Sequence, residues 1–188
     1  MSIPYPPDAF LAELGRFVSL SSQLELQFDM LFISEVIFRG SHSGRVEEIR
    51  ASKLMGMPLD KRIVLIRKVF EVGQAKIKLP FAELQPTLNR YAAARKARDK
   101  LSHGQLTLVM DKDGKIDPQA AQLMYKSWKA KGDWIMERVT VADLQAVISD
   151  GEVLLWEFFD IKMGTAPRSK GSASARVLGQ KQAANSSG

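Results

Sequence analysis

The residues of this sequence best suited to chemistry lie together in the segment Arg98-Asp99-Lys100-Leu101-Ser102-His103-Gly104. His103 is one of two histidines in the chain, and a histidine can take up and release a proton near neutral pH. Arg98 can bind a phosphate through the forked donors of its guanidinium. Because an arginine followed five residues later by a histidine also arises by chance, the surrounding residues must decide the interpretation.

Four features around this pair favour a functional site. Arg98 falls on the apolar stripe of its expected helix, where a charge needs a partner or a function. The apolar members of that stripe are Leu84, Leu88 and Tyr91. Asp99 lies four residues before His103, so its carboxylate can orient the imidazole. His103 stands at the expected helix end, and Gly104 leaves room there for a substrate or a second chain.

A purely structural interpretation of the same residues stays open. Arg98 would then form an ion pair with Glu25 or Glu35 of the first helix, because charge pairs are often structural. His103 would cap carbonyl groups at the end of its own helix. The sequence alone does not decide between this interpretation and a functional site.

The sequence argues against several other kinds of site. It contains no cysteine, which excludes disulfides, thiolate zinc sites and cysteine nucleophiles. His42 lies in a Ser/Gly loop without a nearby acidic partner, so we expect a surface residue and no metal site. No phosphate-binding glycine loop, dinucleotide fingerprint or nucleophile elbow is present, so no cofactor is expected.

Two further groups of basic residues are candidates for RNA contacts. Arg95 and Lys96 would extend a phosphate-binding surface beside Arg98, although a solvated helix face is the simpler interpretation. Lys126 and Lys129 alternate with aromatic residues between Tyr125 and Lys131, as in proteins that bind single strands. Packing of those rings in the core is the favoured alternative.

The length and composition indicate one globular domain, residues 1–163, followed by a tail. The chain has 188 residues, of which 45% are hydrophobic and 26% charged, which suffices for a real core. Residues 164–188 are rich in Gly, Ser and Ala, so we expect a disordered tail. The tail holds four of the 27 basic residues and no acidic residue, so much of the net charge of +6 resides there.

The sequence shows neither a secretory signal nor a membrane span. The first seven residues lack a basic region followed by an apolar region. No apolar run approaches the roughly 20 residues that a membrane span requires. We therefore expect a cytoplasmic protein without a membrane partner.

Three long helical segments should position the candidate site. The first begins after Pro7 with Asp8 as its cap, and its apolar stripe consists of Phe10, Leu14, Phe17, Leu24, Phe28 and Leu31. A second apolar face carries Val18, Phe32 and Val36, so this helix should be buried on more than one side. The sequence predicts a turn at residues 40–44, a short helix at residues 45–55, and a second helix after Pro58.

The third helix is expected to begin near Pro86, which suits a first helical turn, and to end at His103. Gly104 would then adopt the left-handed conformation that terminates many helices. After it, the alternation of residues 106–110 predicts a strand, and Asp113-Gly114 predicts a turn. Asp117-Pro118 would start a short helix ended by Gly132, and residues 134–139 would pair with the first strand.

The last helix carries a clear start signal. Thr140 and Asp143 have the spacing of a capping box, and Val139 and Leu144 have that of a hydrophobic staple. The helix would bury Leu144, Val147, Ile148, Leu155 and Phe158. The sequence thus predicts a mainly α fold, a bundle of four to five helices with a small β-hairpin inserted before the last helix.

The pair Arg98-Asp99 followed by His103 resembles the Arg-polar-x(3–5)-His motif of the HEPN superfamily, the higher eukaryotes and prokaryotes nucleotide-binding domains. The similarity extends over residues 8–162, with two long helices upstream, the motif at a helix end, and then a hairpin and a capped helix. The resemblance implies an HEPN-like helical bundle. It also implies a homodimer in which two motifs face each other across a shared cleft.

The resemblance further implies a metal-independent endoribonuclease, of the kind found in toxin–antitoxin and phage-defence systems. His103 would act as general acid and base on the ribose 2′-hydroxyl, and Arg98 would bind the phosphate. Asp99 would orient His103 or Arg98. The product would carry a 2′,3′-cyclic phosphate.

Two alternatives stand beside the ribonuclease. One is a non-catalytic HEPN-like interaction domain, a subunit or antitoxin-type partner encoded in the same operon as its target. The other is an RNA-binding module that works through the basic tail and the segment from Tyr125 to Lys131.

Overall fold

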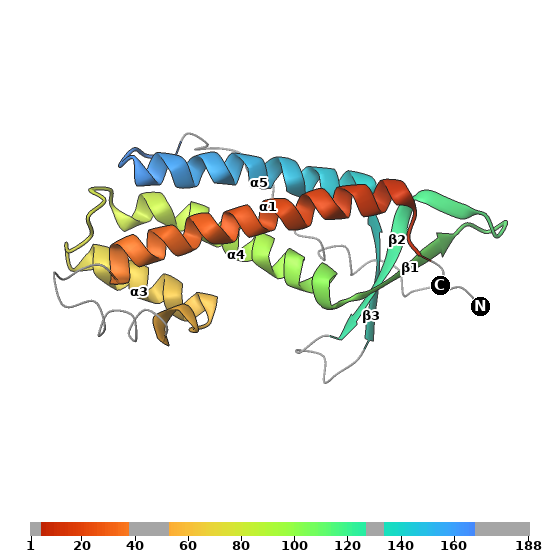
Figure 1. Ribbon diagram of the computed structural model, residues 1–188, viewed down its shortest axis with the longest axis horizontal. Coiled ribbons are helices and arrows are strands. Elements are labelled where there is room, and N and C mark those ends of the chain that lie inside the picture. Colours follow the sequence, from red (N-terminus) through yellow and green to blue (C-terminus); the bar gives the residue numbers. More distant parts are fainter. Residues whose placement is uncertain (1–4, 38–52, 127–133, 168–188) are drawn as a thin grey trace, which may run out of the picture. The chain divides into compact units, whose positions relative to one another are not determined.

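The computed structural model describes residues 5–37, 53–126 and 134–167. Its helices are α1 (Asp8–Phe32), the π-helical segment η1 (Ile33–Ile37), α3 (Leu59–Glu71), α4 (Phe81–His103) and α5 (Val141–Lys162). Its strands are β1 (Gln105–Met110), β2 (Ile116–Lys126) and β3 (Trp134–Thr140). The described chain is therefore mainly helical, with a small antiparallel sheet before the last helix, as the sequence predicted in outline (Figure 1).

Contacts divide the chain into two compact units that interleave along the sequence. Among the described residues, the first unit contains 5–21, 93–126 and 134–150, and the second contains 22–37, 53–92 and 151–167. The end of α4, the sheet and the start of α5 thus belong to the first unit. The predicted turn at residues 40–44, with His42, lies outside the described residues, as does most of the helix expected at 45–55, of which 53–55 are helical.

Three aromatic rings form the centre of the second unit. Tyr91 of α4 stacks on Phe28 of α1 with ring centroids 4.7 Å apart, and it meets the edge of Phe158 of α5 at 5.7 Å. All three side chains are almost completely buried. Aromatic pairs in these geometries stabilise a core beyond their buried area, so this cluster joins three helices that are distant in sequence.

The predicted apolar stripe of α1 is buried, apart from the half-buried Leu14. The second face is buried only toward its end. Phe32 and Val36 are enclosed, whereas Val18 is 43% exposed. Burial on two sides is therefore confirmed for the C-terminal part of this segment and is wrong for Val18.

The buried charges of the second unit have partners. Glu157 accepts hydrogen bonds from Arg90 and from the hydroxyl of Thr87, the latter at 2.9 Å. Glu35 of η1 accepts the backbone N–H groups of Lys76 at 2.7 Å and Ile77 at 3.4 Å. Because a buried carboxylate without partners is strongly unfavourable, these bonds let the unit enclose both groups.

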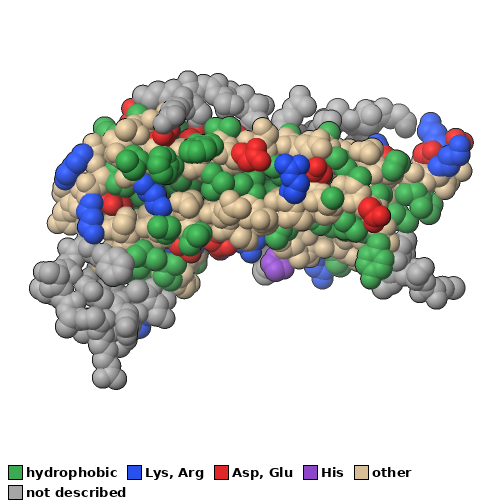
Figure 2. Space-filling model, turned by 45° about the horizontal axis from the view of Figure 1, so that its top comes forward, with side chains coloured by type: hydrophobic (Ala, Val, Ile, Leu, Met, Phe, Trp, Pro, Cys, Tyr) green, Lys and Arg blue, Asp and Glu red, His purple; other side chains and the backbone are tan. Residues whose placement is uncertain are grey.

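A face of the second unit remains apolar at the surface. Figure 2 shows hydrophobic side chains gathered over α5 and α1. The large exposed members in this unit are Leu26 and Met30 of α1, Val153, Trp156 and Phe159 of α5, and Met163, which follows α5. We refer to these six side chains as the α5–α1 face.

The start of α4 differs from the prediction. The helix begins at Phe81, and Pro86 lies inside it rather than in its first turn. Pro80 precedes the first helical residue, and its carbonyl accepts the backbone N–H of Glu83, so it occupies the place assigned to Pro86. The added turn is held by Phe81, whose ring packs 6.2 Å from that of Phe70.

The predicted hairpin is a three-stranded sheet with the order β1-β2-β3. The short helix expected after Asp117-Pro118 is wrong, because residues 116–126 form the central strand. Residues 134–140 pair with this strand and not with β1. Ala121 and Leu123 of β2 are fully buried at alternate positions, so tertiary packing favours a strand over the helix suggested by local spacing. Pro118 stands near the start of the strand, where the missing N–H is tolerated.

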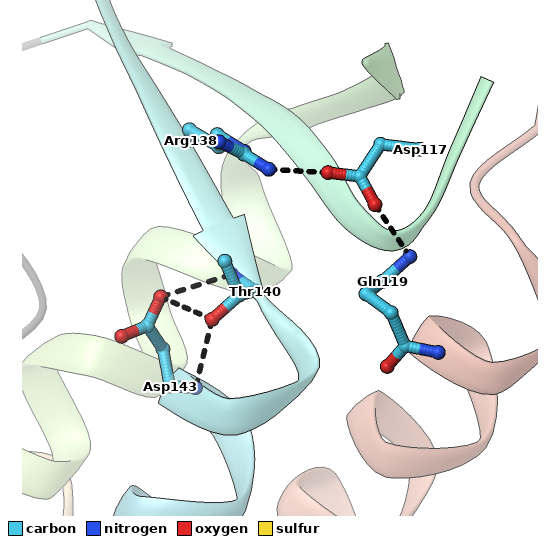
Figure 3. A network of polar contacts seen from close by, with 5 residues as sticks. All are labelled: Asp117, Gln119, Arg138, Thr140 and Asp143. Atoms are coloured by element: carbon cyan, nitrogen blue, oxygen red, sulfur yellow. Dashed lines mark hydrogen bonds and ion pairs between the residues drawn. The ribbon is translucent and has the colours of Figure 1, made fainter. Parts of the chain in front are cut away.

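The capping box of α5 is confirmed. The backbone N–H of Asp143 donates to Thr140 Oγ1 at 3.1 Å, and the N–H of Thr140 donates to Asp143 Oδ2 at 3.0 Å (Figure 3). The Thr140 hydroxyl also donates to the same carboxylate at 2.7 Å. Val139 and Leu144, the predicted staple residues, are both buried. These bonds set the point where β3 passes into α5.

A second polar contact lies near this point in the first unit. Arg138 of β3 forms an ion pair with Asp117 of β2, whose carboxylate also accepts the backbone N–H of Gln119 at 2.9 Å (Figure 3). The Gln119 bond lowers the pKa of Asp117 most, and Arg138 lowers it further. The pair therefore links the two strands at the surface.

None of the helices in the described part of the chain has the length and apolar character needed to cross a membrane.

Candidate functional site: the end of helix α4

The predicted site residues Arg98, Asp99 and His103 all lie in the last two turns of α4, within the first unit. Arg98 Nε lies 3.8 Å from Asp99 Oδ1, and the two side chains are 30% and 49% exposed. Such a pair contributes little stability, because water screens both charges. Both groups therefore remain within reach of a ligand.

His103 is the last residue of α4 and is exposed. An α-helix turns by about 100° per residue, so Arg98 and His103 project about 140° apart around the helix axis. Asp99 and His103 are separated by only about 40° on the same basis. Even so, no hydrogen bond or ion pair joins the two within the described part of the chain. Of the two predicted roles for Asp99, the geometry favours contact with Arg98.

Gly104 ends the helix in a different way from the one predicted. It is absent from the glycines with positive φ among the described residues, so it is not a left-handed cap. A Cβ atom at this position would stand 2.3 Å from Leu123 Cδ1, 2.7 Å from the carbonyl oxygen of Lys100 and 3.2 Å from that of Met124. The space that the sequence suggested for a substrate or second chain is thus occupied by β2. Glycine is required here for the close approach of α4 to the sheet.

A half-buried polar cluster lies beside the motif, and sequence analysis missed it. Lys100 Nζ contacts Glu137 Oε2 at 2.7 Å, and the Tyr125 hydroxyl donates to Glu137 Oε1 at 2.9 Å. The Lys100 ammonium also lies 4.4 Å from the centre of the Tyr125 ring. Burial raises the pKa of Tyr125, and Glu137 raises it further, while Lys100 opposes the shift. This cluster fixes α4 to β2 and β3 next to Arg98 and Asp99.

The cluster had one signal in the sequence. The alternation of β3 turns Glu137 away from the face that carries its exposed neighbours Met136 and Arg138. The sequence did not indicate Tyr125 as the partner of Glu137, because the spacing around Tyr125 predicted a helix.

The predicted RNA-contact residues are only partly brought together. Arg95 is half-buried and Lys96 is exposed, both on α4 and near Arg98 in sequence. Lys126 ends β2, with its ammonium 5.4 Å from the centre of the exposed Trp134 ring on β3. Lys129 lies outside the described residues, as does residue 128.

In the structural interpretation Arg98 could pair with Glu35, but the structure shows other partners for Glu35. That carboxylate belongs to the second unit and binds the backbone of Lys76 and Ile77. One ion pair of Arg98 is with Asp99. For His103, no hydrogen bond to a helix-end carbonyl is found within the ranges that the structure describes. Over those same ranges, no three His, Asp or Glu side chains lie where they could hold a metal ion.

The chain matches no protein-family model, no curated protein sequence and no solved structure.

Proposed function

We propose that this protein is a metal-independent endoribonuclease of HEPN type, with its site at the end of α4. The observation that carries the proposal is an exposed imidazole on the last residue of the helix, with the accessible Arg98 guanidinium one and a half turns before it. An exchangeable proton and a phosphate-binding cation are the two groups that RNA cleavage by its own 2′-hydroxyl requires.

In this reaction His103 removes the proton from a ribose 2′-hydroxyl, and the 2′-oxygen forms a bond to the adjacent phosphorus. The bond from phosphorus to the 5′-oxygen of the next nucleotide breaks, and that oxygen takes up the proton that His103 had removed. The products are a 2′,3′-cyclic phosphate and a 5′-hydroxyl end. Arg98 donates hydrogen bonds to the phosphate oxygens as negative charge builds on them, and Asp99 holds the guanidinium from the side.

The divergence of the two side chains suggests how the site is completed. Because Arg98 and His103 project about 140° apart on one helix, a single phosphate reaches both more readily when one group comes from each of two copies. We therefore include a homodimer with shared sites in the proposal. Lys96 and the Lys126–Trp134 pair supply a cation and a stacking surface for flanking nucleotides.

Cleavage assays on single-stranded RNA in the presence of EDTA test the proposal. We expect His103→Ala to lower the rate by about 10²-fold or more and Arg98→Ala by about 10²–10³-fold. The cyclic phosphate should be found on the product. Ser102→Ala, an exposed neighbour on the same turn, serves as the control and should cleave as the wild type does. If both site variants fold and retain the full rate, the proposal is wrong.

Mixing the two inactive variants tests the shared site separately. A mixed dimer of Arg98→Ala with His103→Ala contains one site that keeps both groups, contributed by different copies. Partial recovery of cleavage on mixing is therefore expected. No recovery, with mixed dimers demonstrated, would mean that each copy acts alone.

A second candidate function is a non-catalytic HEPN-like interaction domain, such as a subunit or antitoxin-type partner in a defence or toxin–antitoxin system. It is favoured by the absence of any described residue that orients the imidazole of His103. In that case, purified protein does not cleave RNA, and a specific partner encoded in the same operon co-purifies with it. Loss of that partner on mutation of exposed residues, with Arg98 and His103 dispensable, distinguishes this function.

A further inference from the structure

One side of the three-stranded sheet faces away from α4. On the other side, Leu123 packs against Gly104, and Tyr125 and Glu137 contact Lys100. Successive side chains of a strand alternate between the two faces of a sheet, so the residues between these point away from the helix. We refer to the following eight as the outer sheet face: Gln105 and Thr107 of β1, Gln122, Met124 and Lys126 of β2, and Trp134, Met136 and Arg138 of β3.

The outer sheet face is accessible where β2 ends and β3 begins. Trp134 and Met136 are 60% and 61% exposed, and Lys126 and Arg138 are exposed as well. The register of the two strands arranges the face in three rows, Lys126 with Trp134, Met124 with Met136, and Gln122 with Arg138. Neighbouring rows are about 7 Å apart along the strands. Ala120, the next residue on this side of β2, is fully buried and marks the end of the surface.

The side chains of this face suit a nucleic acid with unpaired bases. An exposed indole offers a flat surface on which a base of any type can stack. The Lys126 ammonium lies 5.4 Å from the centre of the Trp134 ring, so a base stacked there has a cation beside its phosphate. The amide groups of Gln105 and Gln122 can donate to and accept from base edges.

The charges of the outer sheet face favour an anionic ligand. None of the eight side chains is acidic, and two are basic. Arg138 forms an ion pair with Asp117 (Figure 3), but a guanidinium has five donors, so it can contact a phosphate while it holds that carboxylate. Lys126 and Arg138 lie two rows apart, about 14 Å along the strands. They therefore stand at the two ends of the stripe formed by Trp134 and Met136.

The same face begins next to the candidate site, within the first unit. Gln105 follows His103 by two residues, so their Cα atoms are within about 7 Å, and it pairs with Met124 in the middle row. From Gln105 to Trp134 is one row and two strand spacings, roughly 12 Å. A stacked single strand rises about 3.4 Å per nucleotide, so it covers this distance in about three to four nucleotides.

We propose that the outer sheet face binds unpaired RNA, with a base stacked on Trp134 and phosphates at Lys126 and Arg138. The choice of RNA rests on the proposed function, which this proposal deepens by restricting the substrate to strands with unpaired bases beside the cleaved bond. Base-paired RNA does not bind in this way, because its bases already stack on one another and are paired along their edges. Sheets of this kind bind two or three bases.

Binding of a fluorescently labelled RNA single strand of about ten nucleotides, measured by anisotropy on His103→Ala so that the RNA stays intact, tests this surface. We expect Trp134→Ala to raise the dissociation constant by about ten-fold or more, whereas Trp134→Phe keeps a stacking ring and most of the affinity. Trp156→Ala is the matched control, because Trp156 is 67% exposed but belongs to the α5–α1 face of the other unit. It should bind as the parent does.

The salt dependence tests the phosphate contact of Lys126. Each phosphate contact to a single strand contributes about 0.7 to the slope of log affinity against log salt concentration. Lys126→Ala should lower the slope by about this amount. Lys112→Ala, which changes an exposed lysine in the turn between β1 and β2, should leave it unchanged. Equal slopes for the two variants would mean that Lys126 contacts no phosphate.

The same RNA annealed to its complement completes the test and should bind at least ten-fold more weakly. Equal affinity for single strand and duplex overturns the proposal, as does a folded Trp134→Ala variant with the parent's affinity. A protein partner that is lost in Trp134→Ala, with no RNA bound by the wild type, also overturns it. RNA binding that depends on Trp134 in a wild-type chain without cleavage refutes the ribonuclease and supports this surface. Cleavage with binding indifferent to Trp134 refutes this surface alone.

Discussion

Gly104, the residue after His103, packs so closely against β2 that a Cβ atom at this position would lie 2.3 Å from Leu123 Cδ1. Leu123 is almost completely buried, so its side chain has little room to move. The candidate site is thus held at the end of a helix that is fixed against the sheet. The close packing of Gly104 fixes the backbone of α4 at this end, next to His103.

Replacement of Gly104 by alanine should destabilise the protein. The added methyl group would overlap Leu123 and the carbonyl oxygen of Lys100, and overpacking of this kind typically costs about 1–3 kcal/mol. Denaturant unfolding measures the loss. Gly15→Ala is the matched control, because Gly15 lies inside α1 with nothing within 4 Å of the added Cβ. That variant should be more stable by about 0.5–1 kcal/mol; equal effects of the two substitutions would contradict the packing at Gly104.

Removal of either partner of the capping box should weaken α5. Thr140→Ala deletes the acceptor for the backbone N–H of Asp143, and Asp143→Ala deletes the acceptor for the N–H of Thr140. Each substitution should lower the free energy of unfolding by about 1 kcal/mol. The double variant should lose less than the sum, because the two bonds support each other. Thr140→Ser keeps the hydroxyl and should restore most of the stability; strictly additive losses would argue against a coupled pair.

The polar cluster beside the motif should be visible in an alkaline titration. Burial raises the pKa of Tyr125 above its ordinary value of 10.0, and Glu137 contributes to the shift. A folded-state pKa above the unfolded one adds stability that is present below the unfolded value and is lost as the pH rises through the folded value. Tyrosinate absorbance, taken as the difference from Tyr125→Phe, should therefore show a late titration.

Glu137→Gln should lower the pKa of Tyr125, because it removes the negative charge that opposes ionisation of the phenol. Lys100, which lowers this pKa, remains in the variant and adds to the downward change. A titration midpoint that is unchanged or higher in Glu137→Gln would show that the contact between Tyr125 and Glu137 is absent in solution.

Sequence patterns correctly predicted the helix ends and the buried helix face that depend on residues close together in the chain. The end of α4 at His103 and the start of α5 at Thr140 and Asp143 are where the sequence placed them. The apolar stripe of α1 also identified its buried side, including Phe28 at the aromatic centre. In each case the cause acts within one or two helical turns, so spacing along the chain is sufficient.

The central strand was missed because its cause is distant in sequence. Residues 116–126 become a strand through pairing with β1 and β3, which places Leu123 beside Leu106 and Glu137. Local spacing of the aromatic residues suggested a helix instead. Because the strand was not predicted, the contact of Tyr125 with Glu137 was not predicted either, since it depends on the register of β2 and β3.

The sequence by itself determined the segment of the candidate site, Arg98 to Gly104 at a helix end, because residue type and helical period carry that information. Tertiary structure decided what surrounds it. It turned Gly104 from a helix cap into a point of close packing, and it brought Lys100 against both Tyr125 and Glu137. These relationships join residues from different elements, and only the folded chain sets the distances between them.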